Sequence, residues 1–146
     1  MVNRFEERRK DYNNALEKLE ESLKETSQDF DDTTMQVIID GTLHRFEFTF
    51  ELAWKALQEI MRLHSVEGTA TGSPREILQL GYKIGFINDS EVWLLMLKKR
   101  NTSVHIYNED EIDEMIMLIR DSFIPAFIVL RDMLVKKLDV VESDWV

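Results

Sequence analysis

The fold class follows from residues 42–63, which read TLHRFEFTFELAWKALQEIMRL. Within this stretch Phe46, Phe48 and Phe50 alternate with polar residues, which is typical of a half-buried strand. Length favours a helix instead, because no Gly or Pro interrupts the stretch and apolar residues keep the helical period throughout. The periodic positions are Leu43, Phe46, Phe50, Ala53, Leu57 and Ile60. We therefore predict one long helix from about residue 34 to residue 63.

Apolar residues recur at helical spacing on both sides of this helix. Ser73-Pro74-Arg75-Glu76 reads as a capping box, and Pro125 predicts a kink within the last helix. We predict four further helices, from about Asn3 to Glu25, from Ser73 to Gly85, from Asn88–Ser90 to Arg100, and from Glu109–Glu111 to about Leu138. Long helices joined by short loops indicate an all-α, antiparallel up-and-down bundle of about five helices, in one domain over residues 1–146.

The composition agrees with this fold and bears on where in the cell the protein is expected to be. The 146 residues include 5 Gly and 2 Pro, too few for the many turns of a strand-rich fold. No stretch approaches the roughly 20 uncharged apolar residues that a membrane span requires. The absence of Cys excludes disulfides and thiolate metal sites. We expect a cytoplasmic protein with no membrane segment.

The net charge of −10 bears on possible ligands. A protein that holds nucleic acid by neutralising phosphates usually has a basic face, and this chain as a whole repels polyanions. Any nucleic-acid chemistry therefore depends on a basic partner or on a local cluster such as Lys98, Lys99 and Arg100.

Arg100 is the most informative single residue. It follows Trp93 by seven positions and Leu97 by three, which places it on the apolar face of the predicted helix. A guanidinium there requires a carboxylate, phosphate or carbonyl partner. Taken alone, this position favours a buried or interfacial salt bridge over a catalytic role.

His105 lies five positions after Arg100, so the two side chains would diverge on an unbroken helix. The intervening residues are modest helix formers, and a distortion there could bring the pair together. His105 could then accept the proton of a 2′-hydroxyl while Arg100 stabilises charge on the phosphate. By spacing alone, a surface or capping His is the favoured alternative. Tyr107 could orient RNA or be a modification target, or be an ordinary Tyr at a helix start.

Glu47 and Glu51 are like charges one turn apart, close to His44 and to Lys55. A solvated polar stripe that continues through Gln58 and Arg62 explains this set better than a metal site. Because the chain also lacks a glycine-rich phosphate loop, a nucleophile elbow and a paired-helix zinc motif, we expect no metal and no cofactor.

The segment Arg100-Asn101-Thr102-Ser103-Val104-His105-Ile106-Tyr107 resembles the R-x4-6-H-x-Y signature of HEPN domains, including the polar residue after the Arg. Residues 40–55, DGTLHRFEFTFELAWK, resemble the second-helix block of the branch called nucleotidyltransferase substrate-binding proteins, or HepT-like toxins. Ser73–Glu76, Gly85–Asp89 and Trp93 follow in the order of that branch. The resemblance covers roughly residues 5–138.

This resemblance implies a helical homodimer with two Arg/His motifs around a shared cleft, and a minimal nucleotidyltransferase encoded nearby as partner. It implies a metal-independent RNase toxin in which Arg100 and His105 are catalytic. Tyr107 would receive AMP from the partner, or would bind RNA together with Asn101. Glu47, Glu51 and Lys55 become candidate cleft or partner contacts.

Two other functions stay open. A non-catalytic substrate-binding subunit would hold a nucleotide for the nucleotidyltransferase in the same cleft, and the negative net charge favours this reading. A structural dimer with a non-functional motif is the third alternative.

Overall fold

A computed structural model describes residues 2–70, 72–101 and 108–144. All regular elements within these residues are helical, in agreement with the predicted all-α class. They are α1 (Val2–Glu25), α2 (Asp32–Leu63), α3 (Pro74–Lys83), α4 (Ser90–Arg100), α5 (Glu109–Leu118), the π-helix η2 (Ile119–Phe123) and α6 (Ile124–Asp144). No helix in the described part of the chain is long and apolar enough to cross a membrane.

Local capping residues set where the helices begin. The side chains of Asp31 and Asn108 accept hydrogen bonds from backbone N–H groups three residues on, at 2.7 Å and 2.8 Å. Ser73 caps α3 in the same way, with Pro74 as the first helical residue. α3 ends before Gly85, whose φ of 82° is the left-handed conformation that only Gly adopts without strain. These ends lie where the sequence predicts them, because each depends on residues within one turn.

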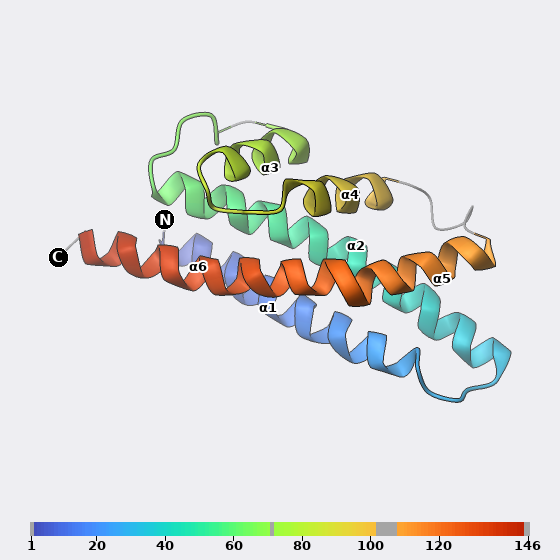
Figure 1. Ribbon diagram of the computed structural model, residues 1–146. Helices are drawn as coiled ribbons and strands as arrows, with labels where there is room; N and C mark the ends of the chain where they lie inside the picture. Colours follow the sequence, from blue (N-terminus) through green and yellow to red (C-terminus); the bar gives the residue numbers. More distant parts are fainter. Residues whose placement is uncertain (1, 71, 102–107, 145–146) are drawn as a thin grey trace.

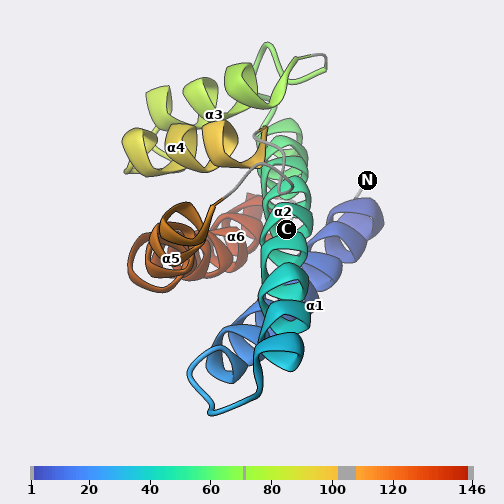
Figure 2. The same ribbon diagram turned by 90° about the vertical axis from the view of Figure 1, so that its right-hand side faces the viewer.

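The long helices form an antiparallel bundle (Figure 1). α1 and α2 make a hairpin, and α6 runs back along them in the direction of α2. In the end-on view of Figure 2, α2 stands in the middle, with α1 on one side and α5–α6 on the other. α3 and α4 form a second, shorter hairpin against α2. α2 thus contacts α1, α3, α4 and α6, as expected for the longest amphipathic helix.

Aromatic residues from α1, α2, α4, η2 and α6 meet in the core. Phe46 stacks on Phe123 with ring centroids 5.1 Å apart, and Trp93 meets Phe127 edge to face at 5.6 Å. The Tyr12 hydroxyl donates to the Phe127 carbonyl at 2.7 Å, and burial of the phenol raises the pKa of Tyr12 well above its usual value. The three phenylalanines that alternate in sequence separate on the helix: Phe46 and Phe50 are buried, whereas Phe48 is 54 % exposed. The helical interpretation of this segment is confirmed.

The last predicted helix appears as α5, η2 and α6, which follow one another along one path (Figure 1). Pro125 has no N–H to give to the Asp121 carbonyl, so the regular hydrogen-bond ladder must change there. The change takes the form of a π turn just before the proline, in which the Ile124 N–H donates to the Ile119 carbonyl. Ile119 and Phe123, the first and last residues of the π turn, stay buried, which explains why the apolar phase continues past Pro125.

Candidate functional site

Arg100 ends α4 and faces α2. Trp93, Met96 and Leu97 bury the inner face of α4, and the helical period places Arg100 at the edge of that face. Its Nη2 donates to the Glu51 carboxylate of α2, in a charge-assisted hydrogen bond between residues 49 positions apart. The Arg100 side chain is 33 % exposed and that of Glu51 is 27 % exposed. The carboxylate partner that the sequence calls for is therefore present, at the rim of the core rather than deep inside it.

Glu51 binds a second cation. Lys55, one turn further along α2, places its Nζ 3.5 Å from the other carboxylate oxygen. The remaining terminal nitrogen of Arg100, Nη1, donates to the side-chain oxygen of Asn101 at 3.3 Å. Arg100 is thus oriented from two sides, and Glu51 partly neutralises it. The Arg100 side chain as a whole keeps one-third of its surface exposed.

Glu47 lies one turn before Glu51 on the same helix and is half-buried. Burial raises the pKa of Glu47, and the nearby His44 and Arg100 lower it by smaller amounts. The sequence predicts a solvated stripe here, but the end of α4 covers part of it. Glu47, Glu51, Lys55, Arg100 and Asn101 therefore form one polar cluster between α2 and α4.

His105 and Tyr107, the other two residues of the motif, lie outside the described residues. Their predicted roles as catalytic base and modification target remain predictions. Within the part of the chain that the structure does describe, no group of three His, Asp or Glu side chains is arranged to hold a metal ion.

His64 lies in the turn that follows α2. It is the C-terminal cap of α2, and its Nε2 lies 2.8 Å from the Lys137 carbonyl of α6. Its ring meets Phe86 edge to face at 5.2 Å. His64 therefore connects the end of α2 to α6. No local sequence pattern indicates this role, because both contacts of His64 come from distant segments of the chain.

A groove of about 550 Å³ between α1 and α2 has no counterpart among the predicted site residues, although it lies close to the cluster. Its apolar lining includes Ala15, Leu52 and the exposed Phe48, and its rim carries Lys18 and Arg45. The feature of the sequence that could have indicated this groove is Phe48, an aromatic residue on the polar side of an amphipathic helix.

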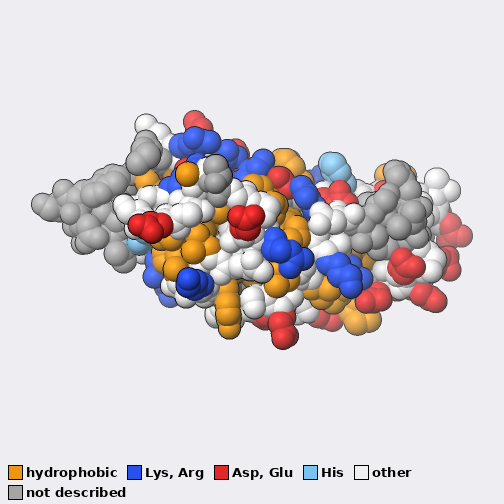
Figure 3. Space-filling view, turned by 90° about the horizontal axis from the view of Figure 1, so that it is seen from above, with side chains coloured by type: hydrophobic (Ala, Val, Ile, Leu, Met, Phe, Trp, Pro, Cys, Tyr) orange, Lys and Arg blue, Asp and Glu red, His pale blue; other side chains and the backbone are white. Residues whose placement is uncertain are grey.

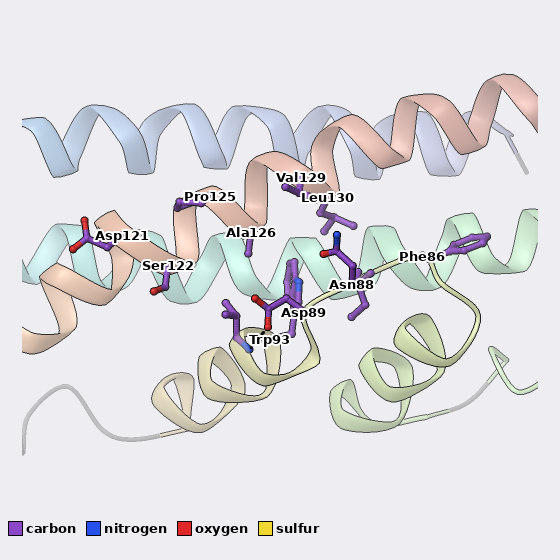
Figure 4. Close-up of a pocket in the computed structure, with 12 residues that line it drawn as sticks. Phe86, Asn88, Asp89, Trp93, Asp121, Ser122, Pro125, Ala126, Val129 and Leu130 are labelled. Carbon is purple, nitrogen blue, oxygen red and sulfur yellow. Dashed lines mark hydrogen bonds between the residues drawn. The ribbon is translucent and has the colours of Figure 1, made fainter.

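A cavity of about 280 Å³ lies between α4 and the π turn, with Trp93, Ala126 and Leu130 among its lining residues (Figure 4). Its two carboxylates already have partners: Asp89 caps α4 through the Val92 N–H, and Asp121 pairs with its neighbour Arg120. This cavity is therefore a less favourable place for a polar ligand than the cluster around Arg100.

Most of the bundle matches a known protein family. Residues 7–136 match the family described as nucleotidyltransferase substrate binding protein like. The chain belongs to this family. The match covers nearly all of the bundle and includes both α2 and the Arg100 segment.

The individual proteins reported next are 21 % to 27 % identical to this chain. A protein of Haemophilus influenzae named probable ribonuclease HepT is 24 % identical over 98 residues, which cover 66 % of this chain and 67 % of that protein. A solved Haemophilus influenzae structure, described as the fold of a substrate binding domain of a nucleotidyltransferase, has a TM-score of 0.73 at 21 % identity. That match covers 84 % of this chain and 96 % of the other. A solved structure from Thermus thermophilus has a TM-score of 0.62 at 27 % identity, and the match covers 87 % of this chain and 98 % of the other.

Proposed function

We propose that this protein is a metal-independent endoribonuclease toxin of the HEPN type, paired with a minimal nucleotidyltransferase in the cytoplasm. The observation that carries the proposal is Arg100, which Glu51 and Asn101 orient at the end of α4, five residues before His105. Preorganised cations of this kind stabilise charge that develops in a transition state. The similarity to a protein named probable ribonuclease HepT supports the same chemistry.

In the proposed reaction His105 takes the proton from an RNA 2′-hydroxyl. The 2′-oxygen then bonds to the adjacent phosphorus, and the bond from phosphorus to the 5′-oxygen breaks. The 5′-oxygen takes a proton from solvent, so the products are a 2′,3′-cyclic phosphate and a 5′-hydroxyl. Arg100 stabilises the charge on the phosphate oxygens. Glu51 acts indirectly, by holding Arg100, and Lys55 binds the other oxygen of the Glu51 carboxylate.

The nucleotidyltransferase would neutralise the toxin at Tyr107. The Tyr107 hydroxyl attacks the α-phosphorus of ATP, and pyrophosphate leaves, so that AMP remains on the phenol. An AMP group two residues from His105 would place negative charge and bulk where RNA must bind.

A homodimer would bring two such motifs together. The groove with the exposed Phe48 lies on α2, beside the Glu47–Glu51 row, and it is the apolar surface best placed to receive a second copy. Phe48→Glu should convert the dimer to a monomer in light scattering at micromolar concentration. Val129→Glu, at a similarly exposed apolar residue of α6, should leave the dimer intact. A wild-type monomer would contradict the dimer.

The test of the reaction is RNA cleavage by the purified protein in EDTA. His105→Ala and Arg100→Ala should each lower the rate by on the order of 10²-fold or more. Arg131→Ala, at an arginine outside the cluster, should not. Tyr107→Phe should abolish partner-dependent AMP attachment while cleavage falls less than in His105→Ala. Undiminished cleavage by His105→Ala would refute the scheme.

A specific observation favours a second candidate, the non-catalytic substrate-binding subunit. The net charge is −10, and Glu47 and Glu51 lie directly beside Arg100, which disfavours a long polyanion. A mononucleotide carries far less charge. Absence of cleavage on any RNA, together with calorimetric binding of ATP that Arg100→Ala removes, would support this role over the RNase.

A further inference from the structure

A second groove, of about 570 Å³, lies between the start of α3 and the outer side of α4. Two cations, Arg75 and Lys98, line it together with the half-buried Leu94 and Leu95, and Glu91 is its one carboxylate. This is a local excess of positive charge in a chain whose net charge is −10. Figure 3 shows the face of α3 and α4, where Lys and Arg side chains lie among hydrophobic ones, while acidic side chains gather mainly at one end.

The folded chain alone gives no reason for a cation at Arg75. This residue is exposed in the first turn of α3, where the helix dipole disfavours positive charge. Its side chain makes no hydrogen bond or ion pair with any of the described residues. Arg75 therefore contributes little to stability and remains available to an anionic ligand.

The groove and the cluster around Arg100 have Asn101 in common. Asn101 lines the groove and also accepts the hydrogen bond from Arg100 Nη1 at 3.3 Å. A ligand that lies along Arg75 and Lys98 and reaches Asn101 is therefore next to the residue that orients the guanidinium to which we assign the reacting phosphate.

We propose that this groove binds the single-stranded RNA that flanks the cleaved bond, an inference that rests on the proposed RNase function. Arg75 and Lys98 bind backbone phosphates, and Leu94 and Leu95 give a base an apolar surface. RNA fits this combination because it alternates phosphates with apolar base faces at short intervals. Phosphate contacts dominate the affinity, because none of the described residues that line the groove is aromatic.

The test measures binding of a short, fluorescently labelled single-stranded RNA by anisotropy, in the His105→Ala background so that the RNA stays intact. Each phosphate contact with a single strand contributes a salt slope of about 0.7, which corresponds to about fourfold in affinity at 0.15 M salt. Arg75→Ala and Lys98→Ala should each weaken binding by about that factor and lower the slope by about 0.7. Both residues are exposed, so circular dichroism should show unchanged helix content.

Two further variants sharpen the test. Glu91→Gln removes the carboxylate of the groove and should strengthen RNA binding, an opposite sign that general destabilisation cannot produce. Lys136→Ala removes an exposed lysine of α6, outside the groove, and should leave the affinity unchanged.

Cleavage assays separate this inference from the proposed function. In the otherwise wild-type protein, Arg75→Ala should raise KM about fourfold with kcat unchanged, since it contacts RNA away from the reacting bond. If the wild type cleaves RNA while Arg75→Ala and Lys98→Ala change neither KM nor affinity, the groove assignment is overturned and the RNase stands. Wild type that cleaves no RNA overturns the proposed function itself. Binding of a polyglutamate peptide, with no binding of RNA, would assign the groove to an acidic protein partner.

Discussion

Replacing Glu51 by Gln tests whether Arg100 is held by α2. The substitution keeps the size and shape of the side chain but removes the charge that binds Arg100 and, at 3.5 Å, Lys55. Both cations lose a charge-assisted hydrogen bond or ion pair, and neither has a second carboxylate partner among the described residues. We expect the folded state to lose stability and Arg100 to lose its fixed orientation.

The size of the loss follows from the exposure of the three side chains, which are 27 %, 33 % and 35 % exposed for Glu51, Arg100 and Lys55. Such partly open pairs fall between exposed ion pairs, worth up to about 1 kcal/mol, and buried charged hydrogen bonds, worth about 1.5–3 kcal/mol. We assign about 1 kcal/mol to the Arg100 contact and about 0.4 kcal/mol to the one-turn Lys55 pair. For a chain of this length the total corresponds to a Tm lower by roughly 5 °C.

A double-mutant cycle isolates the Arg100 term. Urea unfolding of wild type, Glu51→Gln, Arg100→Gln and the double variant should give a coupling energy of about 1 kcal/mol in 0.1 M salt. The coupling should shrink in 1 M salt, where the screening length falls to about 3 Å. Glu17→Gln, at an exposed carboxylate of α1, is the matched control and should have little effect. A coupling near zero in 0.1 M salt would refute the reasoning that Glu51 positions Arg100.

Three further changes test other contacts. Glu47→Gln should raise the free energy of unfolding at pH 7, because burial raises the pKa of Glu47 and the folded state disfavours its charged form. The cost of burying the charged form is absent below the pKa of the unfolded state, which is near 4.5. The stability gained by Glu47→Gln should therefore vanish as the pH falls through this region. Urea unfolding at pH 4 and at pH 7 measures the difference. Tyr12→Phe removes the hydrogen bond to the Phe127 carbonyl and should cost about 1 kcal/mol in thermal unfolding, whereas an unchanged Tm would exclude that bond as a stabilising contact. Gly85→Ala should cost about 1–2 kcal/mol through backbone strain at φ 82° alone, since a Cβ there meets no atom within 4 Å. A neutral result would mean that the turn after α3 rearranges.

The candidate site was predictable in its residue types but only partly in its geometry. The motif identified Arg100 and its need for a counter-charge, because a guanidinium on an apolar helix face is costly without one. That the counter-charge is Glu51 depends on how α4 packs against α2, across 49 positions of chain. The same packing leaves Glu47 half-buried, whereas the helical periodicity alone predicts that Glu47 lies on a solvated stripe.

By itself, the sequence determined where the helices lie and which faces they bury. Caps such as Ser73 and Asn108 act within one turn, and the spacing of Phe46 and Phe50 outweighs the strand-like alternation with Phe48 because helical periodicity is a local property. Such features need no knowledge of the rest of the chain.

Only the tertiary structure decided which distant groups meet. His64, the C-terminal cap of α2, contacts the Lys137 carbonyl of α6. The backbone adapts to the hydrogen bond missing at Pro125 by a π turn rather than by a simple kink. The groove that joins Arg75 to the Arg100 cluster exists only because α3 folds back beside α4. In each case the physical reason is the same: the side-chain partner is chosen by close packing between helices, and that packing depends on the whole set of interlocking side chains rather than on any one segment.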